Sequence, residues 1–513
     1  MPKKTKETKK DMEDPEFQPF FPGIEDIVMD ILHTEAVITI KEHDTDREAM
    51  YYFNKPVRNR KGELSNPDLA GIYTRGEEEL KEIAEQTFKE KLKEMSELCD
   101  EVEPDKDGKN PYAELQGRID RKLKHDGIKT HEVNEILNNL RRKTFTDREK
   151  INPGGFIPLN DGFYDLKTHE LREFNASHFY TWKVHGTFDP AIRSLRQIPI
   201  FMNFLIDVFY PQDIPLILDY MAYCLYPEFP RQKILAILGE ARRGKGTLTR
   251  ILEKMIREGY GNLSLFKLLA GDNRFALQGI EGKNLLVDPE IKRNYHKEMD
   301  FSIINSLFGG DTVLMEKKFK AGIDYKPKSK GILVGNIPLF YVNDPAFLSR
   351  LLIVVPKPKP KGWKEITDLD NKIWDAEGSN IVAFLLSRLK GLLKRNFRFA
   401  NELTNEEYAE MWHNMCDSPK MFAEQEMESS HENVIVETAY DLYVAWCETK
   451  NIPPEGRKRF SYEVGKMYPI KRQRINGEPT YVFSDCSLSF LVMEVKISKP
   501  QTNDDDDELD GIL

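Results

Sequence analysis

Lys233-Ile-Leu-Ala-Ile-Leu-Gly-Glu-Ala-Arg-Arg-Gly-Lys-Gly-Thr247 joins an apolar run to a glycine-rich loop that contains a lysine. Glycines let successive backbone N–H groups converge on phosphate oxygens, and the lysine reaches the β- and γ-phosphates. The helix that follows turns the positive end of its dipole toward the same place. The pattern predicts a nucleotide-binding loop formed by Gly239, Glu240, Ala241, Arg242, Arg243, Gly244, Lys245, Gly246 and Thr247.

The residues after the loop agree with this prediction. Apolar side chains recur with helical spacing over 248–256, so an apolar strand, a loop and an amphipathic helix follow one another. The alternative is a tight glycine-rich turn that binds nothing. Gly246 stands directly after Lys245, where a hydroxyl is usual, so the hydroxyl of Thr247 is the predicted Mg²⁺ ligand.

Composition bounds the class of protein. The 513 residues carry a net charge of −10 and suffice for about three domains of roughly 150 residues each. Because no apolar run is long enough for a bilayer and no signal peptide opens the chain, we expect a cytoplasmic protein without a membrane partner. The five cysteines form no C-x-x-C pair, so neither disulfides nor a zinc site are expected.

The chain divides into segments of different pattern. We expect a disordered basic tail (1–20), an N-terminal α+β domain (21–150) with a helix over 77–99, a helical domain (151–230), a nucleotide-binding α/β core (231–356), a linker and helical segment (357–430), a basic module (431–490) and an acidic tail (491–513). The Lys-Pro alternation that begins at Pro356 cannot continue a central strand and predicts a linker or an edge.

Polar residues at the ends of other apolar runs complete a hydrolytic constellation. Asp288 is the predicted metal ligand and Glu290 the predicted group that orients or deprotonates the attacking water. Asn336 ends an apolar strand expected beside the strand of the glycine-rich loop, where its amide can bind the γ-phosphate or that water. Arg350 precedes the last strand and can act as a finger on a neighbouring subunit's nucleotide. The alternatives are an ordinary strand end for the two acids and a surface salt bridge for Arg350.

The order of these elements resembles the superfamily 3 helicases, in particular the helicase domain of phage, plasmid and large-DNA-virus primase–helicase proteins. Further segments, 70–73, 160–171 and 187–190, are similar to the regions before the motor of that family, so the resemblance covers roughly residues 60 to 485. Ala241 and Arg243 stand where the family often has Gly and Asn. The residues that carry the resemblance are Gly239, Gly244, Lys245, Thr247, Asp288, Glu290, Gly309, Gly310, Asp311, Asn336, Pro338, Asp344, Phe347 and Arg350.

The resemblance implies a multidomain α/β protein. Its parts would be a P-loop, AAA+-like ATPase core, a mainly helical N-terminal region and a C-terminal winged-helix module. It also implies ATP and Mg²⁺ as cofactors, a homo-hexameric ring, and single-stranded and forked DNA as partners.

Two basic segments are candidates for DNA contact. By the resemblance, a hairpin that points into the pore of the ring would carry Lys317, Lys318, Phe319 and Lys320, whose charges follow a phosphate backbone while the ring stacks on bases. The alternative is a solvated hairpin with Phe319 in the core. In the C-terminal module, a basic helix and a hairpin resemble a winged helix, with a solvated basic face as the alternative. The candidate residues there are Arg457, Lys458, Arg459, Lys471, Arg472 and Arg474.

The leading hypothesis is an ATP-dependent replicative DNA helicase of a virus or plasmid. The alternative is a replication initiator or loader that uses ATP as an assembly switch without processive unwinding. A primase is disfavoured because the region before residue 150 has no cysteine cluster and no clear Asp-x-Asp constellation for two metals. Priming would then come from a separate protein, for which the acidic tail with its apolar end, Glu508 to Leu513, is a candidate contact. The alternatives are a tail that lies across the protein's own DNA channel and weakens non-specific binding, and an ordinary solubilising tail.

Overall fold

The computed structural model describes residues 18–41, 48–104, 106–269, 277–291, 299–315, 323–336, 342, 344–360, 362–449, 454–475 and 477–488. The chain separates into two compact units. One comprises Met1–Pro153 and Phe174–Thr181, and the other comprises Gly154–Glu173 and Trp182–Leu513. The first unit therefore includes a short segment from beyond the expected boundary at residue 150, and the chain crosses between the units more than once.

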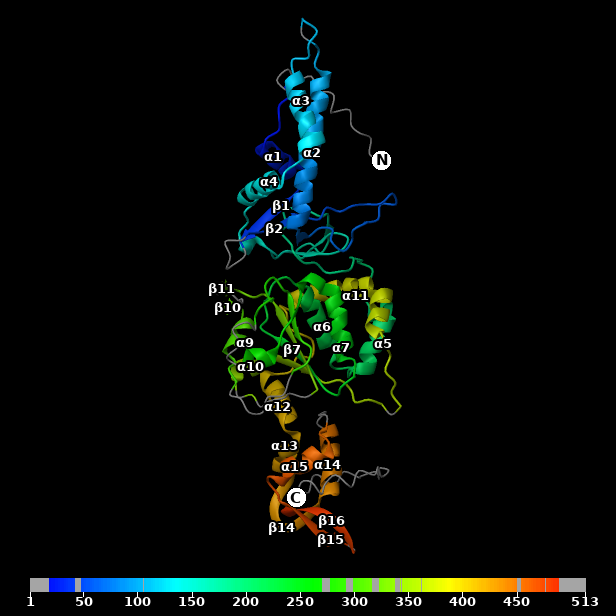
Figure 1. The fold of residues 1–513 in the computed structure, drawn as a ribbon. Helices are drawn as coiled ribbons and strands as arrows, with labels where there is room; N and C mark the ends of the chain where they lie inside the picture. The colour runs from blue at the N-terminus through cyan, green and yellow to red at the C-terminus, as the bar shows by residue number, and fades with distance from the viewer. Residues whose placement is uncertain are drawn as a thin grey trace. The chain divides into compact units, whose positions relative to one another are not determined.

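The first unit packs helices on a small antiparallel sheet (Figure 1). Its helices are α1 (Ile24–Thr34), α2 (Glu77–Glu101), α3 (Ala113–Arg121) and α4 (Thr130–Lys143), with a π-helical turn, η2 (Lys122–Asp126), and a 3₁₀ turn, η3 (Arg148–Lys150). The sheet has the order β1 (Val37–Lys41), β2 (Glu48–Phe53), β3 (Tyr73–Arg75). The apolar stripe of α2 is buried against α1, α3 and α4, which is why its helical spacing is visible in the sequence.

The second unit begins with a three-stranded antiparallel sheet, β4 (Phe156–Pro158), β5 (Phe163–Asp165) and β6 (Leu171–Arg172). A 3₁₀ turn, η4 (Leu195–Gln197), leads into α5 (Pro199–Val208) and α6 (Ile214–Leu225). Helix α6 is buried along nearly its whole length, since apolar residues occupy all of its faces.

A five-stranded parallel sheet forms the centre of this unit, in the order β13 (Leu351–Val354), β7 (Ile234–Leu238), β12 (Lys330–Gly335), β9 (Leu285–Asp288), β8 (Tyr260–Asn262). The residues of β7, β9, β12 and β13 are all buried, as expected for a parallel sheet covered on both faces. Helix α7 (Lys245–Ile256), a 3₁₀ turn, η5 (Arg257–Gly259), and α8 (Leu265–Leu269) connect the first strands. The long helix α11 (Leu369–Lys394) packs on α6 and α7.

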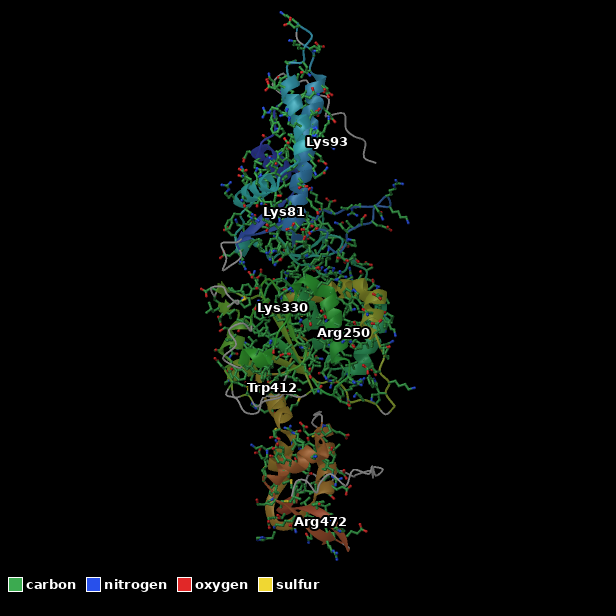
Figure 2. The ribbon with its side chains drawn as sticks, viewed as in Figure 1. Lys81, Lys93, Arg250, Lys330, Trp412 and Arg472 are labelled. Atoms are coloured by element: carbon green, nitrogen blue, oxygen red, sulfur yellow. The ribbon has the colours of Figure 1, made fainter. Side chains whose placement is uncertain are left out.

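Smaller elements lie between the later strands. They are α9 (Ser302–Leu307), the antiparallel pair β10 (Val313–Met315) and β11 (Ile323–Tyr325), and α10 (Pro345–Leu348). The rings of Phe347 in α10 and of Trp412 in the later helix α12 (Asn405–Cys416) meet edge to face, with centroids 5.7 Å apart. Trp412 is labelled in Figure 2.

The C-terminal region is a helical segment followed by a mixed module. Helices α12 (Asn405–Cys416) and α13 (Ser418–Glu426) precede β14 (Met427–Ile435), α14 (Val436–Thr449), α15 (Arg457–Gly465), β15 (Ile470–Ile475) and β16 (Glu478–Leu488). The three strands form an antiparallel sheet in the order β14-β16-β15, so β15 is an edge strand. The module thus gains a first strand that the sequence analysis did not predict. No helix within the described residues is long and apolar enough to cross a membrane.

Candidate nucleotide site

The glycine-rich loop runs from the end of β7 to the start of α7 and leaves its backbone N–H groups unused. Within the part of the chain that the structure describes, no hydrogen bond is donated by the backbone N–H groups of residues 240–247. Gly244 has φ +79°, and a Cβ there would lie 2.7 Å from Val208 Cγ2, so a larger residue does not fit. The loop therefore presents a row of unpaired donors at a helix N-terminus, which is the geometry that binds phosphate.

Lys245 is buried at the base of this loop. Its Nζ donates to the carbonyl oxygens of Gly239 and Glu240, each at 2.6 Å, and lies 3.4 Å from Asn336 Oδ1. Burial lowers the pKa of Lys245 from its ordinary value of 10.5 to about 8, and the side chain meets only neutral oxygens at hydrogen-bonding distance. An anion placed in the loop would stabilise the buried ammonium group.

Asn336 reaches Lys245 because of the strand order. β12 lies directly between β7 and β9, and Gly335 is in register with Leu238 at the ends of their strands. The carboxyl ends of parallel strands meet at one edge of the sheet, so Asn336 emerges next to the loop. The predicted position of this strand beside β7 is confirmed, while the catalytic role of Asn336 stays a prediction.

Asp288 ends β9 at the same edge and is firmly held. One carboxylate oxygen accepts from the backbone N–H of Leu265 at 2.6 Å and the other from that of Glu290 at 3.1 Å. A carboxylate held in this way at a strand end can serve as a metal ligand. Glu290 itself is exposed, two residues beyond Asp288.

The donor types of Asp288 and Thr247, a carboxylate and a hydroxyl, fit Mg²⁺. This ion commonly takes one or two protein oxygens and completes its shell with phosphates and water. The hydroxyl of Thr247 makes no hydrogen bond to any described residue, in contrast to that of Thr249, which donates to the carbonyl of Gly246 at 3.1 Å. Among the described residues there is no group of three His, Cys, Asp or Glu side chains that could hold a metal.

The side chain of Arg243 turns away from the loop. It is 3% exposed, its Nε donates to the carbonyl of Lys357 at 2.8 Å, and its Nη1 lies 3.0 Å from Asp207 Oδ2. Arg243 was predicted as part of the phosphate loop; its backbone N–H belongs to the row of donors, but its guanidinium anchors the loop to α5 and to the segment after β13. Sequence reasoning did not identify Asp207 as its partner.

Arg350 lies at the opposite edge of the sheet. Its carbonyl accepts from the N–H of Ile234, the first residue of β7, while the loop follows the last residue of that strand. A five-residue strand at about 3.3 Å per residue separates the two edges by about 16 Å. The guanidinium, half-buried, donates to the carbonyl oxygens of Phe308 at 3.4 Å and of Ala346. The structure therefore does not place Arg350 near Lys245 of the same chain.

Arg350 lines an open cavity of about 580 Å³ at that edge, together with Arg231, Lys233 and Glu402. Glu402 pairs with both neighbouring cations, at 2.6 Å from Arg231 Nη2 and 3.4 Å from Lys233 Nζ. Burial lowers the pKa of Arg350, and the nearby carboxylates of Asp311 and Asp344 oppose this shift. The cavity is polar, and its charged lining comprises three cations and the carboxylates of Glu402 and Glu406.

The predicted DNA contacts fall into two groups. Lys317, Lys318, Phe319 and Lys320 lie outside the described residues, as does Pro338. In the C-terminal module, the edge strand β15 exposes Lys471, Arg472 and Arg474 to solvent. Arg472 is labelled in Figure 2. Acids lie beside basic residues of both elements: Lys471 of β15 lies 3.4 Å from Asp485, Arg457 of α15 lies 3.9 Å from Glu437, and Arg459 lies 3.5 Å from Glu455.

Comparisons with known proteins match parts of the chain. The family model described as "D5 N terminal like" matches residues 72–210, and the "Family of unknown function (DUF5906)" matches residues 237–346. No curated protein matches the chain. The second segment spans β7, the loop, β9 and β12, so it contains the nucleotide site described above.

Solved structures of the NrS-1 C-terminal region are similar at low identity. The apo structure of its residues 305–718 has 12% identity, covers 62% of this chain and 87% of that chain, and gives a TM-score of 0.34. Two A form apo structures give TM-scores of 0.30 and 0.29 at 11% and 12% identity, and they cover 62% and 60% of this chain and 87% and 86% of theirs. The two family segments are found in primase–helicase type proteins of phages and viruses, and this chain thus carries domains associated with DNA replication.

Proposed function

We propose that this protein is an ATP-dependent replicative DNA helicase of the superfamily 3 kind, with an AAA+-like core that works as a homo-hexameric ring. The observation that carries the proposal is the convergence of Lys245, Asn336 and Asp288 at one edge of the parallel sheet, around unused backbone donors. Backbone donors and a buried cation fixed in advance stabilise the charge that develops on a transferred phosphoryl group.

Each residue has a role in this proposal. The loop and Lys245 bind the β- and γ-phosphates, and Thr247 and Asp288 hold Mg²⁺, which neutralises phosphate charge when bound. The exposed Glu290 orients the attacking water, and Asn336 contacts the γ-phosphate or that water. Arg350 completes the site of a neighbouring subunit, since the length of β7 keeps it from the nucleotide of its own chain.

DNA is the proposed polymer substrate. The C-terminal module, proposed as a winged helix, supports this by the exposed cations of β15, which suit a phosphate backbone. Replacing Arg472 by Ala should lower affinity for forked DNA and reduce the slope of log affinity against log salt by about one. Arg457→Ala is the matched control, and its slope should change less because that side chain pairs with Glu437.

The function is tested by strand displacement on forked DNA with ATP and Mg²⁺, comparing the wild type with Lys245→Ala. We expect displacement by the wild type and none by the variant, with the exposed Lys267→Ala as a control that keeps activity. Displacement that survives Lys245→Ala would overturn the proposal. ATP-dependent assembly on DNA without displacement would favour the initiator or loader instead.

A further inference from the structure

The Lys-Pro segment after β13 lies against the phosphate loop. Pro356 pairs with Phe209 beyond the end of α5, and the N–H of Lys357 donates to the carbonyl of Val208 at 2.8 Å. A Cβ on Gly239 would lie 2.8 Å from Pro356 Cδ, so the segment and the loop are in close contact. We call residues 356–360 the strap. The sequence analysis predicted a linker or an edge here, and contact with the loop is the added finding.

The loop contains a carboxylate that is unfavourable for binding an anion. Glu240 follows Gly239 directly, and its charge acts on Lys245: it opposes the fall in the pKa of Lys245 that burial causes. Phosphate groups bound at Lys245 would therefore be repelled by Glu240 if its charge were left uncompensated.

One residue of the strap engages both oxygens of this carboxylate. The backbone N–H of Lys359 donates to Glu240 Oε2 at 3.0 Å, and Lys359 Nζ lies 3.2 Å from Glu240 Oε1. The charge of Lys359 also reaches Lys245, whose pKa it lowers further. The three charged groups thus form one electrostatic unit, although Lys359 is far along the chain from the other two.

We propose that Lys359 is a positioning residue of the nucleotide site, which neutralises Glu240 and holds its carboxylate against the strap so that phosphates can occupy the loop. This inference rests on the proposed function, because it assumes that the loop binds ATP. Lys359 acts through Glu240 and is not a phosphate ligand. The strap is itself fixed by Arg243, which binds the carbonyl of Lys357, so the loop and the strap hold each other in place.

A double-mutant cycle on the full chain tests the proposal, with ATP affinity measured by calorimetry or by a fluorescent ATP analogue. Lys359→Met should weaken ATP binding about fivefold, the scale of a partly exposed charge pair. Glu240→Gln should bind ATP at least as tightly as the wild type. In the Glu240→Gln background, Lys359→Met should change affinity by no more than about twofold.

Controls separate charge from folding. Lys359→Arg keeps the charge and should retain wild-type affinity. Lys357→Met removes a lysine of the same strap whose Nζ donates to the carbonyl of Ile206 at 2.7 Å, and it should also leave affinity unchanged. A loss of the same size in both backgrounds would make Lys359 a direct phosphate ligand and overturn the proposal, as would an unaltered affinity of Lys359→Met.

The outcome also distinguishes this inference from the proposed function. If the wild type binds no ATP, or if Lys245→Ala binds it equally well, both fail. If Lys245→Ala loses binding while the cycle shows no coupling between Glu240 and Lys359, only the role of Lys359 fails.

Discussion

The two edges of the parallel sheet differ in what they bring together. At the carboxyl edge, Lys245, Asn336 and Asp288 gather around unpaired backbone donors within one chain. At the opposite edge, Arg350 lines a cavity together with Arg231, Lys233, Glu402 and Glu406, and none of the described residues that line it belongs to the glycine-rich loop. In the proposed function, the first edge binds the nucleotide within one chain. In the proposed function, Arg350 at the second edge contributes its charge to the nucleotide site of a neighbouring subunit.

The largest expected effect is the loss of ATP turnover when Arg350, at the edge opposite the loop, is replaced. Arg350→Ala should lower the rate of ATP turnover about a thousandfold, the scale of an arginine finger, while leaving ATP affinity within about threefold. Because the finger and the loop would come from different chains, mixing Arg350→Ala with Lys245→Ala should restore part of the turnover. Turnover is measured by phosphate release at constant total protein. Mixed samples that stay inactive would contradict a site shared between chains.

A second variant tests whether Asn336, which contacts Lys245 at the carboxyl edge, contributes to ATP turnover. Asn336→Ala removes a hydrogen bond to a charged group and to the proposed phosphate or water, so turnover should fall about thirtyfold. Asn110→Ala is the control, since Asn110 lies in the other compact unit, where its Nδ2 donates to the carbonyl of Cys99 at 2.7 Å. Equal losses in the two variants would show that the effect comes from general damage to the fold.

Local patterns predicted much of the fold. The helix expected over 77–99 is α2, which ends at Glu101, and its stripe was visible because one face alone is buried. The loop and the acidic strand end were predicted for a similar reason, since each pattern is contained in a few neighbouring residues. The order of the parallel strands has no such local pattern, because each pairing joins distant parts of the chain. Only the place of the Asn336 strand beside β7 was expected.

Around the loop, too, local features were predicted from the sequence and contacts between distant residues were not. The sequence indicated that Lys245 serves phosphate, but not that Arg243 binds Asp207 or that Glu240 binds Lys359, 119 residues further on. Such pairs depend on where the strap and α5 pack. The alternation of Lys and Pro after β13 was the only available indication, and it predicts an extended segment without naming its neighbour.

The two lysines that flank β7 respond differently to pH. Burial lowers the pKa of both lysines, and a carboxylate opposes each shift: Glu402 for Lys233 and Glu240 for Lys245. The pKa of Lys245 still falls from 10.5 to about 8. Between these values the unfolded chain binds more protons than the folded chain, so this lysine makes the free energy of unfolding rise with pH. Bound phosphate favours the charged lysine, so the Kd for ATP should rise about tenfold per pH unit above pH 8.

The control for this pH dependence is Lys245→Met, measured over the same range. Burial also lowers the pKa of Lys330 to about 7, so the effect of Lys245 is the difference between the two proteins rather than the wild-type curve alone. The wild type should lose ATP affinity above pH 8 while the weak binding of the variant stays flat. Parallel curves would contradict the assignment of the titration to Lys245.

The smallest expected effect is a difference in the free energy of unfolding between variants of Asp288, the last residue of β9, and of Glu290. Asp288 is 3% exposed and accepts two backbone N–H groups, so Asp288→Asn would turn an amide NH₂ toward one of these donors and lower the free energy of unfolding by about 1 kcal/mol. Glu290→Gln alters an exposed side chain and should change the free energy of unfolding by less than about 0.5 kcal/mol. Urea denaturation of both variants without nucleotide measures this difference. Equal stability would mean that the protein does not hold Asp288 in place, and that only bound nucleotide and metal could order this edge.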